Sequence, residues 1–286
     1  MAVAVQTFAD RLAAEVERKR SQLVVGLDPR PDLLPVELRG DVARFCCGIV
    51  DAVAPHAIAV KPQLAFFEAL GPEGMRAFER VCAYARAAGL LVIADAKRGD
   101  IGSTARAYAA AYLEGDEPRV DALTVNPYVG REGTEPFVAA ARRNDTGVFV
   151  LVKTSNAGAD VQDVTLSDGR PLWHHVAKLV CEWGEDVVGE HGLSSVGAVV
   201  GATHPRAVGE ARKLMPQTVL LLPGVGAQGG SPRDLERAFT SGPASALVTA
   251  SRSVIYAFRD SGEDFRSAAG AEAARLRREV WAVSGW

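Results

Sequence analysis

The chain of 286 residues is long enough for one large domain or two small ones, and its 48% apolar and 23% charged residues are typical of an ordinary globular protein. A formal net charge of −3 provides no basic surface for nucleic acid and no polybasic segment for a membrane, so we expect neither as a partner. Every apolar run falls short of the roughly eighteen residues that a membrane span needs.

The first twenty residues have the pattern of an amphipathic helix. MAVAVQTFADRLAAEVERKR lacks the basic start and the cleavage site of a secretory leader, and Thr7 and Asp10 have the spacing of a helix-capping pair. We predict a helix over about residues 6–20. The four cysteines form no C-x-x-C pair, which favours free thiols in a reducing cytoplasm.

Eight short apolar segments recur along the chain and predict eight β-strands. They are near-continuous runs of Val, Leu, Ile and Ala, the pattern of parallel strands that are buried on both faces. The predicted strands are residues 23–28, 57–63, 90–97, 122–127, 147–155, 196–202, 218–226 and 245–252. Helical patterns such as residues 76–89 and 173–192 lie between them. This alternation predicts an α/β fold, a (β/α)8 TIM barrel that forms a single domain over residues 1–286 with the N-terminal helix added.

A doubly wound open sheet also alternates strands with helices and is the competing architecture. The ends of the predicted strands distinguish the two. Five of the eight strands finish in polar or charged residues, namely Asp28, Lys61, Asp95 with Lys97, Ser155 and Arg252. A barrel gathers all of these side chains on one rim, where the active sites of barrel enzymes lie. The barrel is therefore the better prediction.

Residues 90–104, LLVIADAKRGDIGST, run from an apolar strand into a cluster of charges. Side chains alternate along a strand, so Asp95 and Lys97 point the same way, and Asp100 follows on the loop. Lys61 stands at the matching end of the preceding strand. A lysine among carboxylates should stay protonated, because opposite charges favour the charged form. A structural ion-pair network is the competing interpretation, but the convergence of these four charges on the functional rim favours a site.

The string DAKRGDIGST resembles the D-x-K-x-x-D-I-x-x-T signature of the orotidine 5'-phosphate decarboxylase family, in its longer bacterial branch. GLDP at the first strand, VKPQ at the second, PGVGAQ at the seventh and ASR at the eighth extend the resemblance over essentially the whole chain. The resemblance implies a carboxy-lyase without a cofactor or metal, which converts orotidine 5'-phosphate (OMP) to UMP in pyrimidine synthesis.

The resemblance also implies roles for individual residues. Lys61, Asp95, Lys97 and Asp100 would form the family's charged array, with Lys97 as the proton donor to pyrimidine C6. The family's homodimer would place Asp100 in the partner's pocket. The substrate contacts that it implies are Asp28 and Thr104 for the ribose, Ser155 (or its neighbour Thr154) for the pyrimidine, and Gln228, Gly229 and Arg252 at the phosphate end.

GVGAQG, residues 224–229, also fits the G-x-G-x-x-G motif of dinucleotide-binding folds. That motif needs an acidic residue about twenty positions later, and none occurs between Glu236 and Asp260. In a barrel the same loop binds phosphate beside a helix N-terminus. Ser231 as N-cap and Pro232 as the first helical residue predict that helix start.

Other functions remain open from the sequence. A metal-dependent sugar-phosphate lyase or synthase is the alternative enzyme, because related barrels share the D-x-K-x-x-D array. A third hypothesis is a barrel that only binds a phosphorylated ligand and catalyses nothing. The intact Lys97 argues against it. The five histidines lack metal-ligand spacing. The long polar segment 155–171 is a candidate covering loop.

Overall fold

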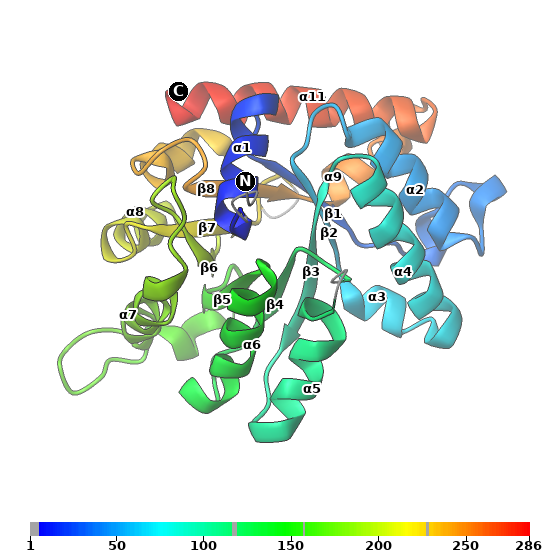
Figure 1. Cartoon of the computed structure of the whole chain (residues 1–286). Helices are drawn as coiled ribbons and strands as arrows, with labels where there is room; N and C mark the ends of the chain where they lie inside the picture. The colour runs from blue at the N-terminus through cyan, green and yellow to red at the C-terminus, as the bar shows by residue number, and fades with distance from the viewer. Residues whose placement is uncertain (1–5, 116–118, 157, 227–228) are drawn as a thin grey trace, which may run out of the picture.

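The strands close into a barrel, as the sequence predicts. The computed structural model describes residues 6–115, 119–156, 158–226 and 229–286. Each strand pairs in parallel with the next along the chain, and the last pairs with the first (Figure 1). The strands are β1 (Leu23–Leu27), β2 (Ala59–Pro62), β3 (Leu91–Arg98), β4 (Ala122–Val125), β5 (Gly147–Lys153), β6 (Ser194–Val200), β7 (Thr218–Pro223) and β8 (Ala246–Ala250).

Helices alternate with the strands and surround the barrel (Figure 1). The α-helices are α1 (Phe8–Lys19), α2 (Val42–Val53), α3 (Leu64–Glu68), α4 (Gly71–Ala87), α5 (Gly102–Leu113), α6 (Arg131–Asn144), α7 (Leu172–Gly184), α8 (Pro205–Leu214), α9 (Arg252–Ile255), α10 (Phe258–Ser261) and α11 (Phe265–Ser284). The 3₁₀ helices are η1 (Pro31–Leu33), η2 (Val36–Leu38), η3 (Ala159–Asp163), η4 (Glu185–Val187) and η5 (Pro232–Phe239). Within the described residues, no helix has the length and apolarity needed to cross a bilayer.

The apolar strand residues build two cores, and the alternation along β3 shows how. Val92 and Ala94 belong to the layer between the strands and the outer helices. Leu91 and Ile93 belong to the second core, which fills the inside of the barrel. Because side chains alternate along a strand, the next residue on the inner face is Asp95. The near-continuous apolar runs therefore reflect burial on both faces, and the charges begin where the inner apolar core ends.

Helix α1 packs on the inner core, where its Phe8 ring meets Phe149 of β5 edge-on at 6.1 Å between centroids. This close approach requires glycine at position 147, because a Cβ there would lie 2.3 Å from a carbon of the Phe8 ring. The helix begins as predicted, since the Thr7 hydroxyl accepts the Asp10 N–H at 3.2 Å. The barrel core and the N-terminal helix are thus one packed unit.

Two predicted helices differ from the structure. The pattern over residues 173–192 predicts one long helix, but α7 ends at Gly184, whose carbonyl accepts the Ser194 hydroxyl at 2.9 Å. Beyond it, the backbone N–H of His191 donates to Asp10 at 3.1 Å, so contacts with α1 override the helical pattern. The helix predicted to begin at Ser231 does begin there, with the Ser231 hydroxyl accepting the Arg233 N–H, but it is a 3₁₀ helix.

Candidate active site

The charged end of β3 is held in an irregular conformation. The pairing of β3 with β4 shifts register between Ala94 and Arg98. Within this bulge Lys97 has a φ of +48°, a left-handed conformation that costs a non-glycine residue about 1–2 kcal/mol. Its backbone N–H donates to the hydroxyl of Thr124 on β4 at 3.0 Å. The bulge therefore aims the Lys97 side chain in a direction that a regular strand would not provide.

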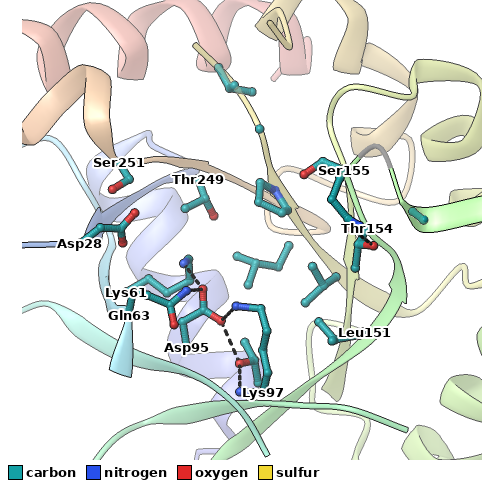
Figure 2. Close-up of a pocket in the computed structure, with 18 of the residues that line it drawn as sticks. Asp28, Lys61, Gln63, Asp95, Lys97, Leu151, Thr154, Ser155, Thr249 and Ser251 are labelled. Carbon is teal, nitrogen blue, oxygen red and sulfur yellow. Dashed lines mark hydrogen bonds and ion pairs between the residues drawn. The ribbon is translucent and has the colours of Figure 1, made fainter. Parts of the chain in front are cut away.

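Asp95 is the centre of the site. It is 7% exposed, and both of its oxygens are occupied (Figure 2). Oδ2 accepts the Lys61 ammonium at 2.5 Å and the Gln63 amide at 3.1 Å. Oδ1 accepts the Lys97 ammonium at 2.5 Å and the Thr124 hydroxyl at 3.1 Å. One carboxylate thus joins side chains from the ends of three neighbouring strands, β2, β3 and β4.

The charges of this cluster support one another. Burial by itself would raise the pKa of Asp95, but the adjacent Lys61 and Lys97 ammonium groups outweigh it and hold that pKa well below its usual range. Burial likewise disfavours the charged form of Lys61, and the charges of Asp95 and Asp28 overcome it, so the pKa of Lys61 is raised. Asp95 is therefore an anion and Lys61 a cation at neutral pH.

The two lysines differ in their access to solvent. The Lys61 side chain is 8% exposed, whereas that of Lys97 is 44% exposed. Both ammonium groups line a cavity of about 530 Å³, which lies within the usual range for small-molecule sites. Figure 2 shows Lys61, Asp95 and Lys97 grouped along one side of this cavity.

A second wall of the cavity carries polar atoms without partners. Thr249 of β8 is 5% exposed, and its hydroxyl oxygen is buried without a hydrogen-bond partner. The same holds for the Ser251 hydroxyl and for Oδ1 of Asp28, which follows β1. All three residues line the cavity and lie near one another in Figure 2. Because an unsatisfied buried polar group costs about 1–3 kcal/mol, this wall is suited to a ligand that carries hydroxyl groups.

The remaining lining is apolar next to Lys97 and polar along one loop. Leu151, Val199 and Leu221 line the cavity on the inner face of β5, β6 and β7. The loop after β5 supplies Thr154 and Ser155. An apolar wall beside a polar loop can hold a flat, partly polar ring.

Residues 154–156 and 158–163 lie at the cavity, and hydrogen bonds tie them to one another and to β5. Gln162 accepts the Thr154 N–H at 2.9 Å and donates to its hydroxyl at 2.9 Å. The Thr154 hydroxyl itself donates to Asn156 at 2.7 Å. Asp163 accepts the buried Lys153 ammonium at 2.6 Å. The loop that the sequence marks as a candidate cover thus lies at the cavity, and the Thr154 hydroxyl is engaged within it.

At the predicted phosphate end, Arg252 lines the cavity as the first residue of α9, two positions after β8 ends. Gly229 lies in the glycine-rich loop with a φ of +88° but is not among the residues that line the cavity. Gln228 lies outside the described residues. The structure therefore places one of these three predicted contacts at the cavity wall.

Two predicted residues lie elsewhere. The carboxylate of Asp100 accepts the Ile101 N–H at 2.8 Å, and Thr104 is exposed in the first turn of α5. Neither lines the cavity of its own chain. The array that a single chain assembles is Lys61, Asp95 and Lys97, without the fourth member.

Sequence reasoning missed four residues of the site: Gln63, Thr124, Thr249 and Ser251. Each follows from a signal in the sequence, because each occupies an inner-face position at or just beyond a strand end. Their polarity in an apolar run was the signal. The described residues contain no group of three or more His, Cys, Asp or Glu side chains placed to hold a metal ion, and all four cysteines are free.

Comparison with known proteins connects this geometry to a family. Residues 21–266 match the model of the orotidine 5'-phosphate decarboxylase / HUMPS family. An orotidine 5'-phosphate decarboxylase of Rhodopirellula baltica is 47% identical over 281 residues, covering 92% of each chain. That of Deinococcus radiodurans is 49% identical over 255 residues, covering 88% of this chain and 90% of the relative. The structure of Leishmania donovani OMP decarboxylase superposes with a TM-score of 0.77 at 33% identity, covering 97% of this chain and 98% of the other.

Proposed function

Because this chain belongs to the orotidine 5'-phosphate decarboxylase / HUMPS family, we infer that its reaction is the decarboxylation of OMP to UMP in pyrimidine synthesis. The observation that carries this inference is the Asp95 carboxylate held between two ammonium groups on the wall of a cavity at the strand ends. It is a preassembled charge cluster in a partly buried site, which is what a reaction that builds up charge without an electron sink requires.

We propose that Lys97 both stabilises and quenches the charge that decarboxylation creates. When the bond from C6 to the carboxylate breaks, CO2 leaves and the electron pair remains at C6. The Lys97 ammonium attracts this pair and transfers a proton to C6, which yields UMP and a neutral amine. Solvent then returns the proton to Lys97. Asp95 is excluded as the acid, because its pKa lies far below the usual range.

The remaining contacts follow from the chemistry of each wall. We assign the ribose hydroxyls to Asp28, whose buried oxygen has no partner, with Thr249 and Ser251 beside it. We assign the pyrimidine edge to Ser155, which lines the cavity on the loop after β5 and is the position that the family resemblance implies for this contact.

At the other end of the substrate, the Arg252 guanidinium offers charge-assisted hydrogen bonds to the phosphate. Gln228 and Gly229 of the neighbouring glycine-rich loop are proposed as further contacts at this end.

We further propose a homodimer in which Asp100 and Thr104 enter the partner's site. Both lie outside the cavity of their own chain, and three large apolar side chains just before the starts of α5 and α6 are exposed. Ile101 is 53%, Tyr128 88% and Val129 43% exposed. Large apolar side chains exposed at the starts of two successive helices favour a protein interface over this part of the surface. A second copy of the chain would cover them and supply the fourth charge of the array.

We propose that residues 1–286 form one domain and that the protein works in the cytoplasm, where a reducing environment keeps its four cysteines free.

The activity is tested by mixing the purified protein with OMP and following the ultraviolet absorbance change as the pyrimidine loses its carboxylate. We expect turnover that is unchanged by an excess of EDTA. Turnover of OMP that disappears with EDTA and returns with a divalent cation would contradict the proposed metal-free chemistry. No turnover of OMP together with metal-dependent turnover of a sugar phosphate would favour the lyase or synthase instead. No absorbance change with fresh protein of native fold would reject the proposed reaction.

The shared site is tested by mixing Asp100→Asn protein with Lys97→Ala protein under conditions of subunit exchange. If Asp100 acts in the partner's site, each heterodimer has one site with both residues and one site with neither. Random pairing makes about half of the dimers heterodimers, so activity should recover to about a quarter of that of the wild type. Activity that stays at the level of the separate variants would place Asp100 in its own subunit's site or outside the reaction.

A further inference from the structure

Thr124 of β4 contacts both Asp95 and Lys97 of β3. It is 1% exposed and lines the cavity. Its hydroxyl accepts the backbone N–H of Lys97 at 3.0 Å and donates its one proton to Oδ1 of Asp95 at 3.1 Å. The carbonyl of Ala94 is a more distant acceptor at 3.5 Å, so the carboxylate is the preferred one.

The position of this hydroxyl follows from the irregular pairing of the two strands. Ala94 pairs with Leu123 and Arg98 with Val125, so β3 advances by four residues over a stretch in which β4 advances by two. Leu123 and Val125 belong to the outer core, which turns Thr124 to the inside of the barrel. Thr124 is therefore the only residue of β4 between the two paired positions, and it faces the extra residues of β3.

We propose that Thr124 is a positioning residue, which sets the orientation of the Lys97 ammonium and of the Asp95 carboxylate. The inference rests on the proposed decarboxylation and deepens it. A hydroxyl is the group that this place requires, because it accepts from the Lys97 N–H and donates to Asp95 at the same time. Valine would fill the same volume and do neither.

The Lys97 backbone conformation makes this contact consequential. Lys97 is one of three non-glycine residues with positive φ among those described, and such a conformation persists only where its surroundings hold it. The hydrogen bond from its N–H to Thr124 is a direct restraint on that conformation. Without it, we expect the bulge to relax and the ammonium to move relative to C6.

The test compares Thr124→Val with Thr124→Ser in steady-state turnover of OMP. We expect the valine variant to lose about 10- to 100-fold in kcat, the range typical of residues that orient a catalytic group, with KM and UMP affinity within roughly threefold. The serine variant keeps the hydroxyl and should retain kcat within roughly threefold. Thr146→Val is the matched control: Thr146 is 1% exposed, its hydroxyl has no partner, and it does not line the cavity, so its kcat should be unchanged.

The outcomes separate this inference from the proposed reaction. A wild-type protein that does not turn over OMP would reject the reaction itself, whatever the variants do. If the wild type is active and Thr124→Val has an unchanged kcat, Thr124 does not position the site. If Thr124→Ser loses as much as Thr124→Val, the hydroxyl is not the group that acts, and this outcome decides the question even where the valine variant folds poorly. An equal loss in kcat and in UMP affinity would also overturn the inference, because it indicates general disruption of the cavity.

Discussion

Replacing Asp95 by asparagine should destabilise the protein by about 3 kcal/mol, the lower end of the cost of breaking a buried ion pair. Asparagine keeps the size of the side chain but leaves the Lys61 ammonium, whose side chain is 8% exposed, without its partner at 2.5 Å. The charge of Asp28 still acts on Lys61, which places the cost at the lower end. Lys97 adds little to the cost, because its side chain is 44% exposed and water can solvate it.

The free energy of unfolding should depend on pH between pH 7 and about pH 10 in the variant, whereas the same charge cluster leaves that of the wild type constant over this range. In the wild type the pKa of Lys61 is raised on folding, so its contribution is complete below about pH 10.4 and is lost as the pH rises through the folded value. The depressed pKa of Asp95 adds stability above about pH 3.9 that is lost as the pH falls toward the folded value. Without Asp95, burial dominates and lowers the pKa of Lys61. The unfolded variant then binds more protons, so its stability should rise from pH 7 to about pH 10.

Urea denaturation at pH 7 and at about pH 9.5 measures both effects. The double variant Asp95→Asn/Lys61→Met removes the orphaned charge and should be more stable than Asp95→Asn alone. Asp186→Asn is the control, because Asp186 pairs with Arg142 on the surface, where the side chains are 79% and 44% exposed, and it should change stability by less than about 0.5 kcal/mol. A loss below about 1 kcal/mol for Asp95→Asn, or losses that simply add in the double variant, would refute the reasoning.

Two further predictions concern turnover. Lys97→Ala should nearly abolish decarboxylation while UMP affinity, measured by calorimetry, stays within about tenfold, because Lys97 acts on charge that develops in the transition state; substantial residual turnover would exclude Lys97 as the proton donor. Arg252→Ala should lower kcat/KM for OMP much more than for orotidine, which lacks the phosphate, because the lost contacts are remote from C6; equal losses for the two substrates would mean that Arg252 does not bind the phosphate.

The barrel and the core of its charged array could be predicted because both depend on local pattern. Apolar runs report burial on both faces of a strand. The two-residue period predicts Asp95 and Lys97 on the same side, and the two side chains do meet at 2.5 Å, although through a bulge rather than a regular strand. The meeting of Lys61 with Asp95 follows from parallel neighbours that end on one rim. These relations hold for any parallel barrel, so they required no knowledge of the exact register.

The unpredicted features depend on tertiary contacts. The left-handed backbone of Lys97 arises from a shift in the pairing of β3 with β4, and a register shift has no signature in one strand's sequence. The early end of α7 at Gly184 is set by Ser194, ten residues later. In each case, the deciding partner lies on another element, outside the window in which a periodic pattern can be read.

The difference between the two lysines determines how they can divide the chemistry. A proton donor must regain its proton after every turnover, which requires a route to water. Lys61 is buried against Asp95, with 8% of its side chain exposed, and its pKa is raised, so it stays positively charged and is a poor source of protons. Lys97 reaches the same carboxylate from the side that is open to the cavity, so it can give up a proton and recover it. The Asp95 carboxylate contacts both lysines at 2.5 Å. It therefore holds the permanently charged Lys61 and the proton-donating Lys97 in one hydrogen-bonded group at the end of β3.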